Sequence, residues 1–147
     1  VVKDVVFTER WGEEDYRFLC QCLQNTVATG GQVWGAFLEG RLKGFASVES
    51  APLGKAGDYR DLTCLHVSAE LRGRGIGREL FCRAACTAQD FGAQSLYISA
   101  HSARETQAFY ARMRCLEAAE PDPTLSAAEP CDCQLEFPLG AVEKQRS

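Results

Sequence analysis

A short run of arginine and glycine, Leu71–Arg78 with the sequence L-R-G-R-G-I-G-R, is the stretch of the chain best suited to chemistry. It follows a strand-like run, Asp61–Val67, and precedes an apolar-periodic run that begins at Glu79. Glycines let the backbone approach a ligand closely, arginines add positive charge, and the start of a helix offers free N–H groups. The run therefore predicts an anion site at a helix N-terminus.

The spacing of the glycines narrows the kind of anion site. A Walker loop requires G-x-x-x-x-G-K-[ST], and no lysine followed by serine or threonine occurs here. The dinucleotide fingerprint requires G-x-G-x-x-G, whereas Gly73, Gly75 and Gly77 are spaced G-x-G-x-G. The pattern that remains is [Q/R]-x-x-G-x-[G/A], filled by Arg72, Gly75 and Gly77. A solvated basic turn, or a nucleic-acid contact through the arginines, is the alternative interpretation.

The chain before this loop predicts a strand, a helix and an antiparallel meander. Apolar residues recur at helical spacing up to Ala28, and a tight turn around Gly40 separates two strand-like runs as in a hairpin. Residues 50–57 are rich in proline and glycine, which is typical of a loop. The expected elements are a strand over Val2–Thr8, a helix from Glu13 to Ala28, and strands over Gln32–Glu39, Leu42–Glu49 and Arg60–Ser68.

The chain after the loop predicts a crossover followed by a second helix. A helix with an apolar face from Leu80 to Phe91 should end at Gly92, and the next strand should cover Gln94–Ala100. This arrangement is typical of a βαβ unit with the glycines at the carboxyl end of its first strand. Ser102-Ala-Arg-Glu105 is a capping-box pattern that opens a further helix. One face of that helix should carry Thr106, Phe109, Tyr110 and Met113.

The last part of the chain predicts a loop over Glu117–Glu129, which is rich in proline and acidic residues, and a strand over Cys131–Pro138. We expect residues 1–140 to form one domain and residues 141–147 to be a C-terminal tail.

Composition excludes several function classes. The 147 residues carry a net charge of -4, so general affinity for nucleic acid or for an anionic membrane is not expected. No apolar stretch approaches the roughly 18 residues of a membrane span, and the first residues do not resemble a signal peptide, so we expect a cytoplasmic protein.

The eight cysteines include two C-x-C pairs, Cys20/Cys22 and Cys131/Cys133, which do not match zinc spacing. We interpret them as reduced thiols and expect no metal, with a metal or redox role as the alternative.

The loop and its flanks together resemble the GNAT superfamily of acetyl-CoA-dependent N-acetyltransferases. The resemblance includes Arg72, Gly75 and Gly77, the strand before them, the helix after them, the strand Gln94–Ala100 and the helix that carries Phe109-Tyr110. It implies an α/β (α+β) fold with a mixed, mostly antiparallel sheet of about six to seven strands. This sheet would be splayed between the strands that end near Val67 and Ala100, with helices on both faces.

The resemblance also implies a site for acetyl-CoA as co-substrate. The loop amides would bind the pyrophosphate, the main chain of Leu65–Val67 would pair with the pantetheine arm, and an amide there would polarise the thioester carbonyl. Ser102 stands where many relatives carry an asparagine that contacts the pantetheine. The residues implied in acetyl-CoA binding are Leu65, His66, Val67, Arg72, Gly73, Arg74, Gly75, Ile76, Gly77, Arg78 and Ser102.

Two side chains are candidates for proton transfer. Tyr110 matches the family's tyrosine that protonates the departing thiolate as general acid, and a core tyrosine is the alternative. Asp61 is the candidate general base, and alternation along the strand predicts that it shares a face with Leu65 and Val67. The alternative interpretation of Asp61 is a solvated or salt-bridged acid at the strand end, and the alternative bases are Glu49 and ordered water. His66 has the opposite parity and is expected to pack or to lie at the surface.

These expectations amount to an N-acetyltransferase that moves an acetyl group to a primary amine of a small molecule or a peptide, by direct attack in a ternary complex. A non-catalytic CoA-binding or regulatory module is the alternative, and an acyl-cysteine route ranks below direct transfer because no cysteine lies beside a histidine in the sequence. The short first helical region leaves the acceptor groove open or calls for a neighbouring subunit, so a homodimer is a further expectation. Where relatives often have Leu-Gly-Phe, this chain has Met113-Arg114-Cys115, which puts the acceptor pocket in doubt more than the CoA site.

Overall fold

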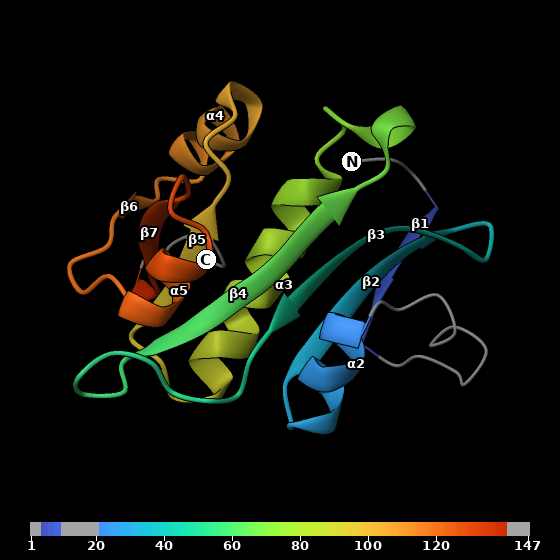
Figure 1. Cartoon of the computed structure of the whole chain (residues 1–147). Helices are drawn as coiled ribbons and strands as arrows, with labels where there is room; N and C mark the ends of the chain where they lie inside the picture. Colours follow the sequence, from blue (N-terminus) through green and yellow to red (C-terminus); the bar gives the residue numbers. More distant parts are fainter. Residues whose placement is uncertain (1–3, 10–20, 141–147) are drawn as a thin grey trace.

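A mixed sheet of seven strands forms the centre of the computed structural model, which describes residues 4–9 and 21–140 (Figure 1). The strand order is β1-β2-β3-β4-β5-β7-β6, and the β4–β5 pair is parallel while the other neighbouring pairs are antiparallel. The predicted fold class is therefore confirmed. The strands are β1 (Val5–Thr8), β2 (Gln32–Leu38), β3 (Arg41–Val48), β4 (Tyr59–Val67), β5 (Ser95–Ala100), β6 (Leu116–Glu117) and β7 (Cys133–Pro138).

The predicted hairpin joins β2 to β3. Its two turn residues, Glu39 and Gly40, have φ angles of 53° and 76°, and two consecutive positive values are typical of a turn whose twist matches that of the flanking strands. The expected helix from Glu13 is described from Gln21 onward, as α2 (Gln21–Ala28), and its first part lies outside the described residues. The same is true of Cys20 and of the tail over residues 141–147.

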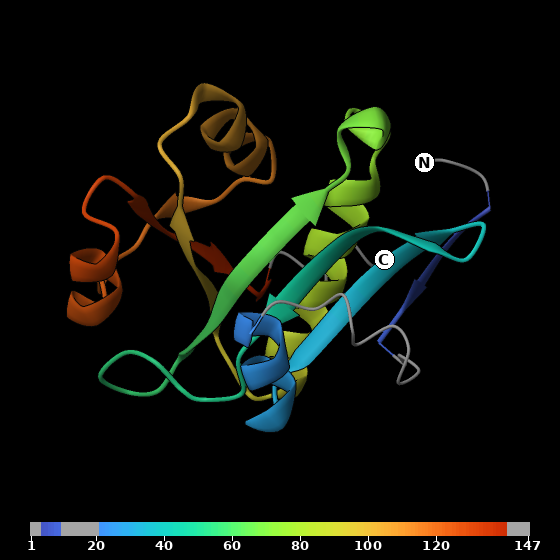
Figure 2. The same ribbon diagram turned by 45° about the vertical axis from the view of Figure 1, so that its right-hand side comes forward.

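The sheet splays between β4 and β5. The two strands pair at Tyr59–Asp61 with Ser95–Tyr97, and no further pair joins them toward the carboxyl ends of the two strands in the described chain. Figures 1 and 2 both show β5 beside the start of β4 and distant from its arrowhead. The inner edge of β4 from Leu62 to Val67 therefore has no neighbouring strand, and its backbone is open to a ligand.

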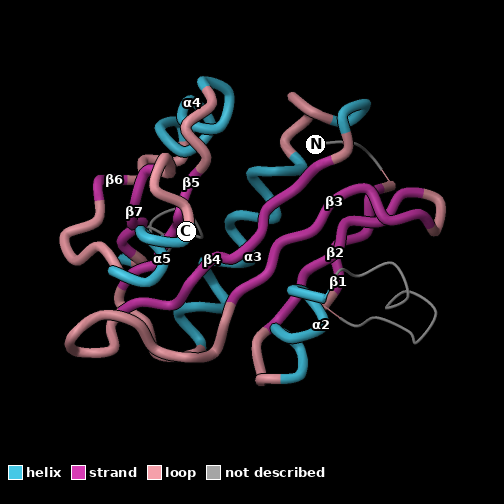
Figure 3. The backbone as a smooth tube through the Cα atoms, in the orientation of Figure 1, coloured by secondary structure: helices cyan, strands magenta, loops and turns pink. Residues whose placement is uncertain are grey.

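Helices cover both faces of the sheet (Figure 3). On one face, α3 (Ile76–Asp90) and α4 (Arg104–Arg112) share a core with Leu62 of β4, and the rings of Phe81 and Phe109 meet edge to face with centroids 6.2 Å apart. On the other face, Leu23 of α2 packs on β2, and α5 (Pro123–Ala128) packs through Leu125 near β4 and β5. A short 3-10 helix, η1 (Ala69–Leu71), leads from β4 into the glycine-rich loop.

The predicted loop over Glu117–Glu129 was partly wrong, because it contains α5. The side chain of Asp122 accepts hydrogen bonds from the N–H groups of Thr124 and Leu125, and Pro123 occupies the first helical position. Aspartate at the cap followed by proline is a favoured helix start. This local signal was hidden by the high proline and acid content of the segment.

Within the described residues, no helix combines the length and the apolar character that a membrane span would need.

Candidate functional site

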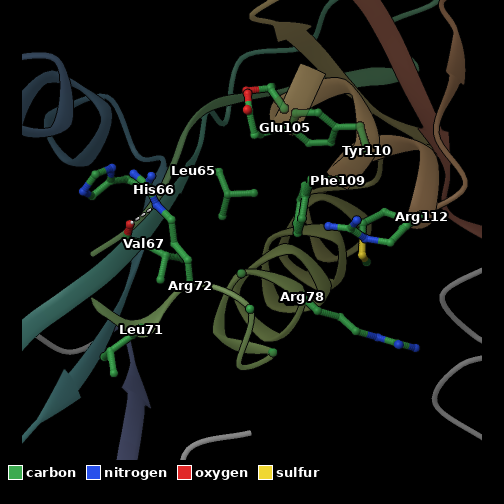
Figure 4. Close-up of a pocket in the computed structure, with 15 residues that line it drawn as sticks. Leu65, His66, Val67, Leu71, Arg72, Arg78, Glu105, Phe109, Tyr110 and Arg112 are labelled. Carbon is green, nitrogen blue, oxygen red and sulfur yellow. Dashed lines mark hydrogen bonds between the residues drawn. The ribbon is translucent and has the colours of Figure 1, made fainter. Parts of the chain in front are cut away.

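A cavity of about 980 Å³ lies between the open edge of β4 and α4, with the glycine-rich loop at one end (Figure 4). It joins two segments that lie far apart in the sequence, β4 with its loop and α4. Nine of the residues predicted for the site line it: Leu65, His66, Val67, Arg72, Gly73, Gly75, Gly77, Arg78 and Tyr110. The splayed sheet thus brings the predicted anion loop and the predicted acid to one cavity.

The glycine-rich loop is shaped to leave the start of α3 open. Gly73 and Gly75 have φ angles of 79° and 82°, a region that favours glycine. Gly75 is the N-cap of α3, and no side chain caps the helix there. The first N–H groups of α3 therefore face the loop without a capping side chain, as an anion site requires.

Gly77 keeps this end of the cavity clear. A Cβ atom at this position would lie 3.3 Å from Cε1 of Phe109 and 3.6 Å from Cγ2 of Val67. The glycine thus lets α3 approach both α4 and the end of β4 closely. The open helix start and the absence of this Cβ are the observations by which the loop fits a diphosphate.

The walls of the cavity are apolar and its mouth is charged. In Figure 4, Leu65 points toward Phe109, whereas the ring of His66 points away from it. His66 is exposed and lies against Phe45, with ring centroids 5.4 Å apart, which confirms its expected place at the surface. Arg72 donates from Nε to the carbonyl of Val67 at 3.3 Å, so that its guanidinium stays at the end of β4.

Three residues predicted to bind acetyl-CoA do not line the cavity. Arg74 is exposed, and Ile76 is buried in the core. Ser102 is exposed, and the predicted capping box is wrong: α4 has Ala103 at its N-cap and no side-chain cap. The turn is held instead by His101, whose Nδ1 accepts from Ala103 N at 3.0 Å and whose carbonyl accepts from Gln107 at 2.7 Å.

Tyr110 is buried in the wall of the cavity and is 8% exposed. Burial, with smaller contributions from the thiols of Cys115 and Cys64, raises the pKa of its phenol far above the ordinary value. Tyr110 of α4 lines the same cavity as Leu65 and Val67 of β4, so the ring faces the cavity that separates the two elements. The hydroxyl is therefore protonated at neutral pH and is suited to donate rather than to accept a proton.

Several lining residues of α4 were not predicted as site residues. Phe109 and Met113 line the cavity beside Tyr110, together with Glu105, Thr106 and Arg112. Their helical spacing was visible in the sequence, and it correctly predicted a shared face. What the spacing did not reveal is that this face lines a cavity as well as packing on the core.

Asp61 lies outside this cavity, and its predicted face was wrong. The β3–β4 register shifts so that Val48 pairs with Leu62 and Ser47 with Cys64, which leaves Thr63 as the extra residue of a β-bulge. Leu62, Leu65 and Val67 all pack on the core under α3, so Asp61 faces the opposite side of the sheet. A one-residue bulge inverts the parity that simple alternation predicts.

A second, smaller cavity of about 300 Å³ receives Asp61, beside Glu49 and Asp122. Burial, together with smaller contributions from the nearby carboxylates of Glu49 and Asp122, raises the pKa of the Asp61 carboxyl to about 7. Asp61 is also the last residue of β4 that pairs with β5. It therefore stands where the two strands begin to diverge, with a proton affinity suited to a general base.

The raised pKa of Asp61 predicts how stability depends on pH. An unfolded chain loses this proton near pH 4, whereas the folded protein holds it until about pH 7, so the carboxyl costs the fold stability as pH rises between these values. Asp61→Asn should therefore be more stable than the wild type at pH 8, by up to roughly 4 kcal/mol. The difference should shrink toward pH 4. Urea unfolding at both pH values measures it, and an unchanged or lower stability at pH 8 would contradict the unfavourable burial.

The cysteines of the described region do not form disulfides. None of the six cysteines whose side chains are described forms a disulfide, Cys131 and Cys133 included. Burial raises the pKa of the Cys115 thiol to about 12 and also raises that of Cys82, so these thiols are protonated at neutral pH. No group of His, Cys, Asp and Glu that could hold a metal ion is found in residues 4–9 and 21–140.

Comparisons with known proteins agree with this geometry. A sequence profile described as the acetyltransferase (GNAT) family matches residues 3–114. No curated protein matches the chain. Among solved structures, N-acetylglutamate synthase from Neisseria gonorrhoeae, complexed with coenzyme A and N-acetyl-glutamate, is similar with a TM-score of 0.70 and 15% identity, over 92% of this chain and 35% of that one.

Two further solved structures are similar over almost their whole length. A GNAT acetyltransferase from Elizabethkingia anophelis with acetyl-CoA bound has a TM-score of 0.67 and 13% identity, over 93% of this chain and 99% of that one. One from Staphylococcus aureus Mu50 has a TM-score of 0.67 and 15% identity, over 90% and 96%. At these identities the similarity concerns the fold.

Proposed function

Because the chain belongs to the GNAT family of acetyltransferases, we propose that it transfers an acetyl group from acetyl-CoA to a primary amine of a small molecule or a peptide. The single observation that carries this proposal is the unpaired inner edge of β4, which runs from Leu62 to Val67 and leads along the cavity to the glycine-rich loop. An acyl-CoA donor on that edge would have its pyrophosphate at the loop and its thioester near the point where the sheet splits.

The loop would hold the pyrophosphate. The uncapped N–H groups of α3 point to this end of the cavity, and Arg72 and Arg78 line its mouth. Charge-assisted bonds between guanidinium groups and phosphate oxygens are stronger than neutral ones. The open backbone of Leu65–Val67 would bind the pantetheine arm, and an N–H group there would stabilise negative charge on the carbonyl oxygen during attack.

Substitutions in the loop test this assignment. Arg72→Ala and Arg78→Ala should each weaken CoA binding by about tenfold, the value of one charge-assisted contact. Arg74→Ala should weaken it less, because Arg74 does not line the cavity. Titration calorimetry with CoA measures all three. Equal losses for the three variants would indicate general electrostatic attraction instead of a built phosphate site.

Tyr110 and Asp61 would handle the protons. As the amine attacks, Asp61 would take one proton from its nitrogen, directly or through a water, and Tyr110 would give one proton to the departing sulfur. The proton balance is complete when both groups exchange with solvent. About four strand residues, or roughly 13 Å, separate Asp61 from Leu65, so the amine would lie between the carboxylate and the carbonyl-polarising backbone.

Direct transfer is favoured over an acyl-cysteine route. A nucleophilic cysteine needs a thiolate, and the buried thiols of Cys115 and Cys82 have raised pKa values. Both histidines have other surroundings: His66 is exposed on β4 and lies against Phe45, and the Nδ1 of His101 accepts a hydrogen bond at the start of α4.

A panel of amines and peptides assayed with acetyl-CoA tests the proposal. Release of free CoA thiol that depends on the amine would support an N-acetyltransferase. Tight CoA binding without amine-dependent thiol release from any member of the panel would favour the alternative, a CoA-binding or regulatory module. The cellular site of the protein and a homodimer remain expectations that localisation and sedimentation experiments would test.

A further inference from the structure

The second cavity contains a carboxylate that the fold leaves without a partner. Asp61 is only 7% exposed, it lines this cavity, and its side chain makes no hydrogen bond or ion pair within the described residues. Burying a carboxylate without a partner is costly. A group that the fold does not provide is therefore expected to meet Asp61 in this cavity.

Two further carboxylates line the same cavity, and one oxygen of each accepts hydrogen bonds from neighbouring residues. Oε2 of Glu49 accepts from the hydroxyls of Thr26 at 2.5 Å and Thr63 at 3.0 Å. Oδ1 of Asp122 accepts from the N–H groups at the start of α5. The other oxygens, Oε1 of Glu49 and Oδ2 of Asp122, have no hydrogen bond in the described chain and remain available to a ligand.

The position of Asp122 is fixed by a network on the same face of the sheet. Its N–H donates to Oη of Tyr97 at 2.8 Å, and that hydroxyl donates to Gln134 of β7. Tyr59 donates to Glu136 at 2.8 Å and accepts from the N–H of Glu120 at 3.3 Å, which holds the segment just before Asp122. The two tyrosines are positioning residues for this wall of the cavity.

Apart from the acids and Thr124, the wall is apolar, and no basic residue of the described chain lines it. Ala51, Leu53 and Leu125 line the cavity together with the acids, so the cavity offers aliphatic contact together with negative charge. The acids do not form a group that could hold a metal ion. An organic cation with an aliphatic chain therefore matches the cavity better than a bare ion does.

We propose that this cavity binds the acceptor, and that the acceptor is an aliphatic amine that carries a second ammonium group. The inference rests on the proposed function and names its substrate class.

The amine that attacks must be neutral, so it cannot balance the charges of Glu49 and Asp122. A second ammonium, held by the free oxygens of these two residues while Asp61 meets the reacting amine, would balance them, and the alkyl chain would lie on Leu53 and Leu125.

A pair of matched amines tests this directly. With saturating acetyl-CoA, 1,4-diaminobutane should have a kcat/KM at least about tenfold higher than n-butylamine, which has the same chain length and lacks the second ammonium. Glu49→Gln and Asp122→Asn should each reduce that ratio toward one, through KM of the diamine. Glu129→Gln removes a carboxylate at the exposed end of α5, outside the cavity, and should leave the ratio as it is. Equal kcat/KM values for the two amines would overturn the inference.

Binding measured without turnover separates this inference from the proposed function. Calorimetric titration of the enzyme–CoA complex with 1,4-diaminobutane should show binding that Asp122→Asn weakens by at least about tenfold and Glu129→Gln does not. If that result is obtained and no amine releases thiol, the cavity assignment stands and the proposed function fails. If amines are acetylated but the diamine binds no better than butylamine, the function stands and the cavity assignment fails.

Discussion

Replacing Tyr110 with phenylalanine should lower kcat by about 100-fold or more while CoA binding persists. The substitution removes the hydroxyl and keeps the ring, so the contacts that Tyr110 makes with Phe81 and Phe109 are retained. Loss of a positioned acid typically costs between about 10² and 10⁴ in rate. Steady-state kinetics with the best amine of the panel, combined with calorimetry for CoA, measures both quantities.

The physical reason lies in the surroundings of the phenol. Burial raises its pKa well above neutrality, so the hydroxyl keeps its proton until a departing thiolate reaches it. A thermal unfolding curve should show that the variant folds. Unchanged turnover would remove Tyr110 from the mechanism and leave it as a core residue, and a loss of CoA affinity equal to the loss in kcat/KM would assign it to binding instead.

Asp61→Asn should lower kcat/KM by about 100-fold and remove one limb of the pH profile. In the wild type, kcat/KM should rise with pH up to about 7, the raised pKa of Asp61, because only the ionised carboxylate accepts a proton. Asparagine has a similar shape and cannot accept the proton. The amine's own titration affects both proteins equally, so the difference between the two profiles isolates Asp61.

Asp58, three residues before Asp61 in the sequence, provides a matched control. Asp58 precedes β4, its carboxylate is exposed, and it lies in neither cavity. Asp58→Asn should retain the wild-type profile. If Asp61→Asn is both more stable at pH 8 and nearly inactive, the carboxylate is kept for function at a cost to the fold. If it is as active as the wild type, ordered water or Glu49 becomes the better candidate for the base.

The glycine-rich loop at one end of the first cavity could be predicted from local sequence, because its residues are consecutive. The loop from Arg72 to Arg78 joins a strand to a helix, and glycines at fixed spacing determine its backbone wherever the rest of the chain lies. Tyr110 was a candidate acid because it matches the family's tyrosine, and helical spacing predicted that it shares a face with Thr106 and Phe109. The capping box failed since His101, one residue before the predicted cap, organises that turn instead.

The second cavity could not be predicted, because its carboxylates come from distant segments of the chain. Glu49, Asp61 and Asp122 come from the end of β3, the start of β4 and the cap of α5, and only the folded sheet brings them to one cavity. The bulge at Thr63 also determines which face of the sheet Asp61 occupies, and no residue type in that strand predicts a bulge.

By itself, the sequence determined the place of the anion loop, since that follows from the spacing of glycines and arginines within one short segment, and the resemblance of the loop and its flanks to the GNAT superfamily implied the family and the mixed sheet. The tertiary structure alone decided that the open edge of β4 and one face of α4 enclose a cavity, and that three carboxylates meet on the opposite face of the sheet. The physical reason is that strand pairing, bulges and helix packing set the distances between residues that the chain itself leaves far apart.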